Sequence, residues 1–114
     1  MSLFKLTQSE INDVDAFSAI VEPNRRLMLE TMRQKPCTVN ELVTVTGLSQ
    51  PAVSKHLKVL KASNLVVVRP DGQKRWHELN AAPLQEVDQF LEPYRKFINR
   101  KLDRLEHHLG EMDQ

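Results

Sequence analysis

The chain contains 114 residues with a formal net charge of +1, and 40% of them are hydrophobic while 27% are charged. These proportions are those of an ordinary globular domain, so we expect one domain spanning residues 1–114. The sequence has no apolar run long enough to cross a bilayer, no apolar signal-peptide region and only one cysteine, which excludes an intrachain disulfide. We therefore expect a cytoplasmic protein without a membrane partner or a cofactor.

Two helices are predicted in the first third of the chain. Thr7 and Glu10 have the spacing of a capping box, which predicts a first helix over about residues 8–21. Pro23 fits the first turn of a second helix, which runs to about Gln34. Apolar residues recur on the inner side of the first helix at Ile11, Val14, Phe17, Ala19 and Ile20.

Residues 38–61 have the pattern of two short helices joined by a tight turn. Thr38 and Glu41 form a second capping-box spacing, and Gly47 supplies the left-handed residue that ends a helix without a steric clash. Ser49 is the predicted N-cap of the next helix, with Pro51 in its first turn. One apolar stripe holds this second helix and consists of Val53, Leu57 and Leu60. The pattern predicts a helix-turn-helix whose second helix suits the major groove of DNA.

A β-hairpin is predicted directly after this motif. Leu65–Val68 is rich in β-branched residues, Pro70–Gln73 contains an Asp-Gly turn signal, and Lys74–Leu79 is the returning strand. Two strands are marginally stable alone, so they must pack on the helices as a wing. The predicted fold is therefore mainly α with a small β-hairpin, a winged helix-turn-helix in the order α-α-α-α-β-β-α.

Positive charge is concentrated in the helix-turn-helix and the hairpin. Residues 49–76 carry six basic side chains and one acidic side chain, a local charge of +5 on a chain whose total is +1. Such a patch attracts phosphates without making the whole surface cationic. The alternative interpretation is a solvated lysine face without a partner. Further cations around the hairpin tip make this alternative less favoured, namely Arg69, Lys74 and Arg75.

The last segment, residues 81 to about 110, is predicted to be a helix with an apolar seam. Its apolar residues recur at intervals of 3 or 4, close to a heptad pattern, at Leu84, Val87, Leu91, Tyr94, Ile98, Leu102, Leu105 and Leu109. Pro93 interrupts the pattern and predicts a kink or a short break. The seam is longer than the rest of the domain can cover, so we expect part of it to meet a second copy of the chain. The alternative is that it covers only its own domain.

Four runs of the sequence together resemble the ArsR-type (ArsR/SmtB-like) winged helix-turn-helix transcriptional regulators. They are VEPNRRLMLETM (21–32), ELVTVTGLSQPAVSKHLKVLKASNLV (41–66), RPDGQKRWHEL (69–79) and APLQEVDQFLEPYRKFINRKLDRLEHHL (82–109). The resemblance implies a homodimeric repressor that is joined through its first and last helices. It also implies that the partner is a pseudo-palindromic operator in double-stranded DNA.

The resemblance further implies roles for particular residues. The start and outer face of the recognition helix and the wing cations would contact DNA, namely Ser49, Gln50, Pro51, Ala52, Ser54, Lys55, His56, Lys58, Arg69, Lys74 and Arg75. Apolar residues of the first and last helices would form the dimer interface, namely Phe17, Leu84, Leu91, Tyr94, Ile98, Leu102, Leu105 and Leu109.

The chain departs from the metal-sensing members of that family. They carry two cysteines at the positions of Thr38 and Asn40 here, and neither of these side chains supplies a thiolate. On the last helix, His107 and His108 are adjacent and point about 100° apart, so one ion cannot easily bind both. We therefore expect no metal site and place the chain in the subgroup without the cysteine metal box. An ion shared between subunits is the alternative for these histidines.

Other functions are weighed against DNA binding. A winged helix can bind protein instead, although the polar and basic recognition helix favours DNA. Cys37 precedes a helix N-terminus that can lower its pKa, so a ligand- or thiol-responsive repressor is a further alternative. The sequence does not identify a small-molecule effector. The sequence contains no catalytic motif, so we expect no enzyme.

Overall fold

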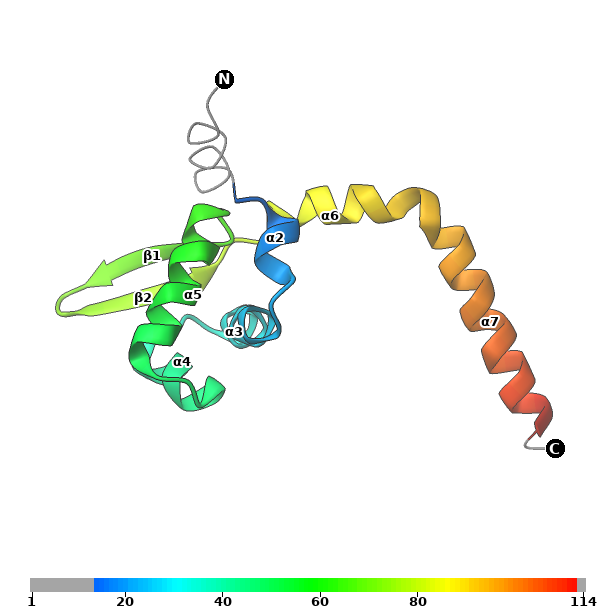
Figure 1. Ribbon diagram of the computed structural model, residues 1–114, viewed down its shortest axis with the longest axis horizontal. Helices are drawn as coiled ribbons and strands as arrows, with labels where there is room; N and C mark the ends of the chain where they lie inside the picture. The colour runs from blue at the N-terminus through cyan, green and yellow to red at the C-terminus, as the bar shows by residue number, and fades with distance from the viewer. Residues whose placement is uncertain (1–13, 113–114) are drawn as a thin grey trace, which may run out of the picture.

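The computed structural model describes residues 14–112, which form a helical body, a projecting two-stranded antiparallel hairpin and an extended last helix (Figure 1). The elements follow in the order α2 (Ala16–Ile20), α3 (Pro23–Gln34), α4 (Val39–Thr46), α5 (Gln50–Ala62), β1 (Val66–Asp71), β2 (Lys74–Leu79), α6 (Leu84–Leu91), the 3₁₀ turn η1 (Glu92–Tyr94) and α7 (Arg95–Met112). This order confirms the predicted winged helix-turn-helix. The predicted last helix is divided into α6, η1 and α7.

The first described helix is shorter than predicted. Residues 14 and 15 are not helical, and α2 begins at Ala16. The Asp15 carboxylate caps the helix there because it accepts a hydrogen bond from the Ser18 backbone N–H at 2.9 Å. The predicted continuous helix over about 8–21 is therefore wrong at these two residues. Residues 1–13, which hold the rest of that prediction, lie outside the described part of the chain.

The helix-turn-helix has the predicted caps. The Thr38 hydroxyl accepts a hydrogen bond from the Glu41 backbone N–H at 3.3 Å, which satisfies one of the free donors at the start of α4. Gly47 ends α4 with a φ of 71°, in the left-handed region that favours glycine. The Ser49 hydroxyl then accepts from the Ala52 backbone N–H at 3.3 Å and starts α5. These local interactions confirm the bounds predicted for the motif.

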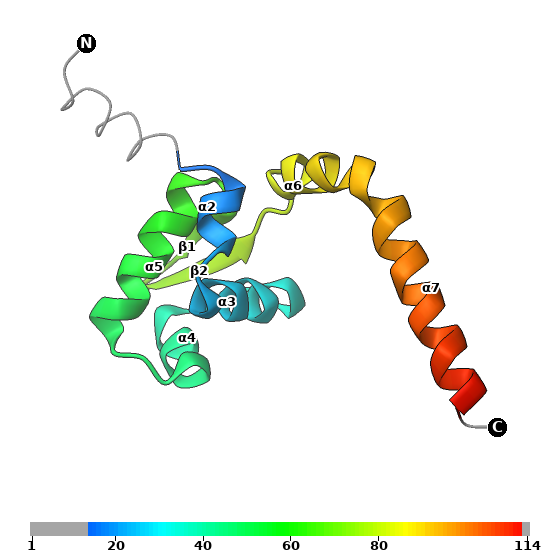
Figure 2. The ribbon, with the colours of Figure 1, turned by 45° about the vertical axis from the view of Figure 1, so that its right-hand side comes forward.

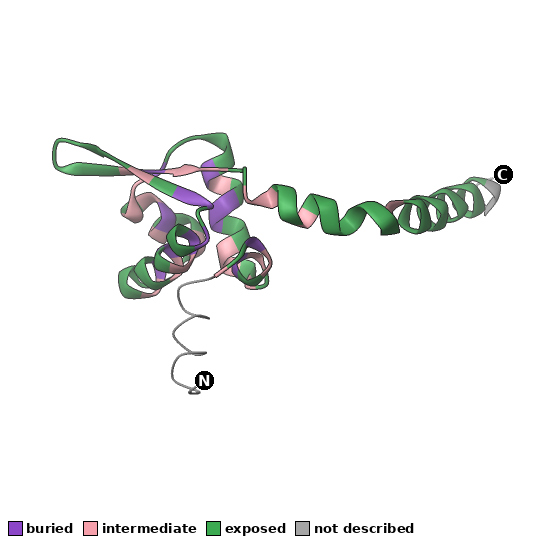
Figure 3. Ribbon diagram, turned by 90° about the horizontal axis from the view of Figure 1, so that it is seen from above, coloured by how far each residue is buried: buried purple, intermediate pink, exposed green. Residues whose placement is uncertain are grey.

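The core lies where α3, α4 and α5 meet the base of the hairpin (Figure 3). The buried apolar residues are Ala16, Ala19, Met28, Leu29, Met32, Cys37, Leu42, Val53, Leu57, Leu60, Leu65 and Val66. The predicted stripe of α5 is fully buried, with Val53 and Leu60 at 0% exposure and Leu57 at 2%. Burying each such aliphatic side chain stabilises the fold by about 1.5–3 kcal/mol, so the inner face of α5 is held firmly.

The hairpin differs from the prediction in its turn. The strands β1 and β2 pair from Val66 with Leu79 to Asp71 with Lys74, so the loop is Gly72-Gln73 and not Asp71-Gly72. Gly72 has a φ of 63° at the first loop position, as a type II′ hairpin requires. The first strand also runs further than the predicted Leu65–Val68. Both strands of a two-stranded sheet are edges, so Pro70 does not interrupt their pairing.

The end of the chain leaves the helical body. Leu84 and Val87 of α6 pack against the core, whereas α7 projects away from the other elements (Figures 1 and 2). The break at η1 confirms the interruption predicted from Pro93. Arg95 holds this bend, since it donates to the Asp88 carbonyl at 3.1 Å and pairs with the carboxylates of Asp88 and Glu92.

Across residues 14–112, every helix is too short or too polar to span a lipid bilayer.

Candidate nucleic-acid interface

The outer face of α5 is exposed along its whole length. Its buried stripe faces the core, and the opposite face is exposed. The exposed residues there are the N-cap Ser49, Pro51 in the first turn, and the polar or cationic Gln50, Ser54, Lys55, Lys58 and Lys61. Ala52 is half-buried beside them. A helix anchored by one apolar stripe can present this opposite face to a groove without losing its own packing.

The C-terminal end of α5 is joined to the hairpin by several hydrogen bonds. Asn64 takes a left-handed φ of 61°, and the N–H groups of Asn64 and Leu65 donate to the carbonyls of Lys61 and Leu60, both at 3.0 Å. The Asn80 side-chain amide also donates to the Asn64 carbonyl at 2.8 Å. Sequence reasoning missed this role of Asn64. The signal was present, because asparagine is the residue after glycine that most readily ends a helix in this conformation.

Cations lie along the hairpin. Lys74 and Arg75 are exposed near the turn, and the Lys74 ammonium lies 5.7 Å from the centroid of the Trp76 ring. Arg69 is also exposed, but its Nε lies 2.9 Å from a carboxylate oxygen of Glu78 on the opposite strand. Because this pair is solvent-exposed, its attraction is weak and leaves the guanidinium able to exchange partners.

A groove connects the start of the recognition helix to the wing tip. It has a volume of about 440 Å³ and is lined by Thr38, Val39, Asn40, Glu41, Gln50, Gln73, Lys74 and Arg75. The structure thus brings Gln50 of α5 and the two wing cations to one concave surface, although they are far apart in the sequence. This surface has polar groups and the Glu41 carboxylate at its helix side and positive charge at its hairpin side, and the cationic side suits a phosphate backbone.

His56 is the exception among the predicted DNA-facing residues. Its side chain is only 20% exposed and turns toward the start of α3, where its Nδ1 lies 3.3 Å from an Arg25 guanidinium nitrogen. Its Nε2 lies 3.9 Å from the Glu22 carboxylate. Desolvation acts to raise the pKa of Glu22, but the hydrogen bonds from the Arg25 backbone N–H and the Asn24 side chain, together with the nearby charge of Arg25, help to lower that pKa below its usual value. His56 therefore contacts the protein rather than extending outward with Lys55.

The apolar seam of the last helices is exposed. The exposed fractions lie between 37% and 54% for the predicted residues from Leu91 onward: Leu91, Tyr94, Ile98, Leu102, Leu105 and Leu109. Leu84, in contrast, is half-buried against the chain's own core, so its packing is already supplied within one subunit. Phe17 is half-buried too, and its ring meets that of Phe90 edge to face at a centroid distance of 5.5 Å.

Sequence reasoning missed two aromatic residues beside this seam. Phe90 is 55% exposed and Phe97 is 63% exposed, and the Phe90 ring also lies 5.4 Å from the Tyr94 ring. They widen the apolar surface around the η1 bend. The signal was available in the helical spacing of Phe90, Tyr94 and Phe97, which flank the heptad positions.

The Cys37 thiol is buried and not activated. The residue has 0% exposure, and its Sγ donates to the Lys35 carbonyl at 3.3 Å. Burial, followed by the negative charge of Glu41, raises the pKa of the thiol above its usual value. The alternative of a thiol activated by the helix N-terminus is therefore contradicted, because burial and Glu41 raise the pKa.

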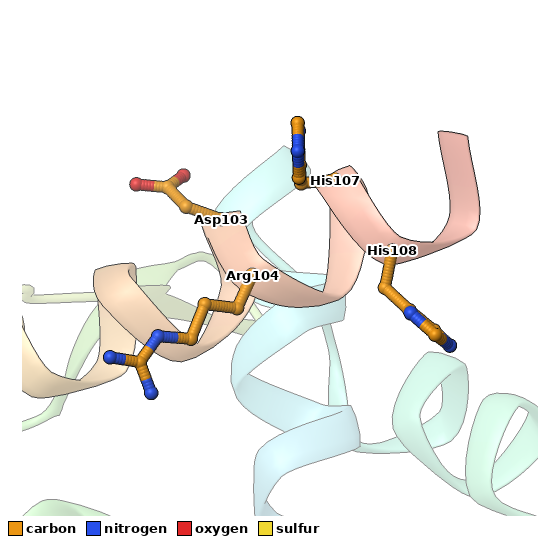
Figure 4. A pocket seen from close by; sticks show the side chains of 4 residues that line it. All are labelled: Asp103, Arg104, His107 and His108. Carbon is orange, nitrogen blue, oxygen red and sulfur yellow. The ribbon is translucent and has the colours of Figure 1, made fainter. Parts of the chain in front are cut away.

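The histidines of α7 diverge from each other. Figure 4 shows that Asp103 and His107 point to one side of the helix, whereas Arg104 and His108 point to the other, around a shallow surface cavity lined by these four residues. Within residues 14–112, no group of three or more histidine, cysteine, aspartate or glutamate side chains is placed to hold a metal ion.

Comparison with known proteins also indicates a DNA-binding regulator. Residues 22–68 match a family described as bacterial regulatory protein, arsR family. The chain is 39% identical over 79 residues to the HTH-type transcriptional regulator Rv2034 of Mycobacterium tuberculosis. The aligned region covers 66% of this chain and 74% of that protein. It is 29% identical over 72 residues to the transcriptional repressor SdpR of Bacillus subtilis, and that aligned region covers 63% of this chain and 80% of the repressor.

A solved structure extends the similarity to most of the chain. The crystal structure of NolR from Sinorhizobium fredii matches with a TM-score of 0.59 and 32% sequence identity, covering 82% of this chain and 94% of that chain. The chain therefore belongs to the ArsR family of bacterial winged helix-turn-helix transcriptional regulators.

Proposed function

We propose that the protein is a homodimeric repressor that binds a pseudo-palindromic DNA operator, as a cytoplasmic regulator of transcription. The observation that carries this proposal is the exposed polar and cationic face of α5, which borders the same groove as Lys74 and Arg75 of the wing. Relatives named as a transcriptional regulator and a transcriptional repressor support the same function. A protein-binding winged helix would present aromatic or acidic residues on that face.

The exposed seam supports a dimer. Six seam residues from Leu91 to Leu109 are at least 37% exposed, and Phe90 and Phe97 enlarge the same surface. An exposed apolar surface of this kind is typical of a protein–protein interface. Twofold pairing lets α7 of each copy cover the seam of the other, and it relates the two recognition helices by the dyad that a pseudo-palindrome requires.

The mode of reading follows from helix-turn-helix geometry. The two copies of α5 enter successive major grooves with half-site centres about 34–36 Å apart. Gln50 is the candidate for adenine and Lys55 for guanine, and each bidentate pairing discriminates by about 1–3 kcal/mol. Ser54 and Lys58 lie on the same exposed face, while Lys74 and Arg75 add phosphate contacts.

Genomic footprinting followed by a fluorescence-anisotropy titration tests this proposal. The protein should bind the footprinted duplex at least about 1,000-fold more tightly than a random duplex of the same length. Gln50→Ala should reduce this preference, while Lys96→Ala, which removes a cation from α7, should leave it unchanged. Equal affinity for footprinted and random duplexes would exclude sequence-specific recognition.

A further inference from the structure

An ionic network joins the recognition helix to the first described helix. The Arg25 guanidinium donates to the carbonyls of Ala19 at 2.7 Å and Ser18 at 3.1 Å, both in the last turn of α2. Its third nitrogen lies 3.3 Å from Nδ1 of His56 on α5. One side chain of α3 therefore contacts two other helices, and α2 lies between α5 and α6 in both views of the molecule (Figures 1 and 2).

The contact between Arg25 and His56 determines which imidazole nitrogen carries the proton. A guanidinium only donates hydrogen bonds, so Nδ1 must accept, and the proton of the neutral ring lies on Nε2. That nitrogen faces the Glu22 carboxylate at 3.9 Å. Glu22 is itself held at the start of α3, because it accepts from the Arg25 backbone N–H at 2.8 Å and from the Asn24 side chain at 3.2 Å. The imidazole therefore lies between the Arg25 guanidinium and the Glu22 carboxylate, and its hydrogen bond is to Arg25.

The network also connects two functional surfaces. His56 directly follows Lys55, a candidate for base recognition, and α2 carries Phe17, whose ring packs on Phe90 of the exposed seam. The last-turn carbonyls of a helix need partners outside the helix, and Arg25 supplies them for α2. Arg25 therefore contacts both the helix that carries Phe17 and the helix that carries Lys55.

We propose that Arg25 is a positioning residue for DNA recognition, which fixes the orientation of α5 relative to α2 and the dimer surface through His56. This inference rests on the proposed function, since it assigns to Arg25 a role in operator affinity. It also explains why His56 faces inward although it lies on the recognition helix. The fork geometry of arginine is needed, because a lysine ammonium cannot contact all three acceptors in the same way.

Arg26 is the matched control. Its guanidinium donates to the carbonyls of Ile20 at 2.7 Å and Val21 at 3.0 Å, so it also binds the end of α2 and carries the same charge. Within residues 14–112, both of these Arg26 hydrogen bonds go to the end of α2, and neither reaches α5. Arg25→Ala should weaken operator affinity about tenfold and random-duplex affinity less than about twofold, whereas Arg26→Ala should change both less than about twofold.

Variants of His56 separate positioning from direct DNA contact. His56→Gln keeps an acceptor for Arg25 and should bind the operator nearly as the wild type does, whereas His56→Leu should weaken binding as Arg25→Ala does. In the double-mutant cycle, adding His56→Leu to Arg25→Ala should weaken operator binding little further than Arg25→Ala alone. Additive losses would mean that His56 contacts DNA on its own, which would overturn the proposal.

A spectroscopic measurement without DNA completes the test. Imidazole ¹⁵N shifts at neutral pH should show Nδ1 of His56 unprotonated in the wild type and in Arg26→Ala, and a mixture of tautomers in Arg25→Ala. Equal effects of the two arginine variants, or unchanged ¹⁵N shifts, would overturn the proposal. If the wild type bound no operator but these shifts behaved as expected, the network would stand and the proposed function would fail.

Discussion

Cys37 and His77 pair through their backbones, although they lie 40 positions apart. The Cys37 N–H donates to the His77 carbonyl at 3.0 Å, and the His77 N–H donates to the Cys37 carbonyl at 2.7 Å. The imidazole Nδ1 lies 3.3 Å from the same Cys37 carbonyl, which requires the proton to be on Nδ1. This bridge joins the linker between α3 and α4 to β2, so it fixes the base of the wing on the helical body.

The buried imidazole predicts a pH-dependent stability. Burial, helped by the charges of Lys61 and Arg75, lowers the pKa of His77 below 6.5. As the pH falls, the unfolded chain therefore binds a proton at His77 at a higher pH than the folded chain does. The contribution of His77 to the free energy of unfolding is fully present above about pH 6.5 and decreases as the pH falls toward the folded pKa. Urea denaturation between about pH 5 and pH 8 measures this, with carboxylates such as Glu22 contributing only at lower pH.

Two histidine variants check that assignment. His77→Gln should remove most of the decrease in this window, since glutamine keeps a donor for Cys37 but does not titrate. His108→Gln, on the exposed face of α7, should keep the wild-type dependence. A decrease that persists in His77→Gln would assign the pH dependence to another group.

Cys37 should be protected from alkylation in the native protein. Iodoacetamide needs a thiolate with access to solvent, and this thiol is buried with a raised pKa. We expect reaction at least about 100-fold slower than in urea, which corresponds to about 2.7 kcal/mol of local opening. A cysteine introduced at exposed Lys35 in a Cys37→Ala background is the control and should react quickly. Fast native alkylation of Cys37 would restore the thiol-responsive alternative.

The turn between α4 and α5 depends on the backbone of Gly47. Gly47 has a φ of 71° with open space around the missing Cβ, so Gly47→Ala introduces backbone strain alone. The expected loss is about 1–2 kcal/mol in the free energy of unfolding by denaturant. The same substitution at Gly110, inside α7, should be neutral or stabilising by up to about 1 kcal/mol. Equal effects at the two sites would contradict this reading of the turn.

The proposed dimer depends on the exposed seam. Leu102→Glu places a carboxylate where the partner is expected to cover an apolar surface, which should cost several kcal/mol and give monomers in sedimentation velocity. Operator binding should weaken with it. Asn99→Glu adds the same charge to an exposed position beside the seam and should remain dimeric. If Leu102→Glu sedimented like the wild type, the interface would lie elsewhere.

The wing is expected to contribute phosphate contacts. Arg75→Ala should weaken binding to operator and random duplexes alike, and it should reduce the slope of log affinity against log salt by about 0.9 per lost contact. Lys96→Ala removes one positive charge from α7 and should leave the slope unchanged. Titrations at several salt concentrations decide this, and an unaltered slope in Arg75→Ala would remove the wing from the DNA-contacting surface.

Local structure was predictable because its causes are neighbours in the chain. Thr38, Ser49 and Gly47 act on backbone groups within a few residues, so the sequence determined the helix-turn-helix and its bounds. The β-branched run Val66–Val68 and the Asp-Gly signal after it also predicted that Lys74–Leu79 returns as the second strand. The turn was placed one residue early, because the pairing of Asp71 with Lys74 depends on the register of the whole hairpin.

Only the tertiary structure decided the directions of side chains whose partners are distant in the chain. His56 meets Arg25 across 31 positions, and Cys37 meets His77 across 40. Helical spacing allows His56 either outward or inward orientation, and the guanidinium of α3 selects the inward one. Likewise, the helix dipole near Cys37 is a local effect, whereas its desolvation arises from packing against the rest of the fold.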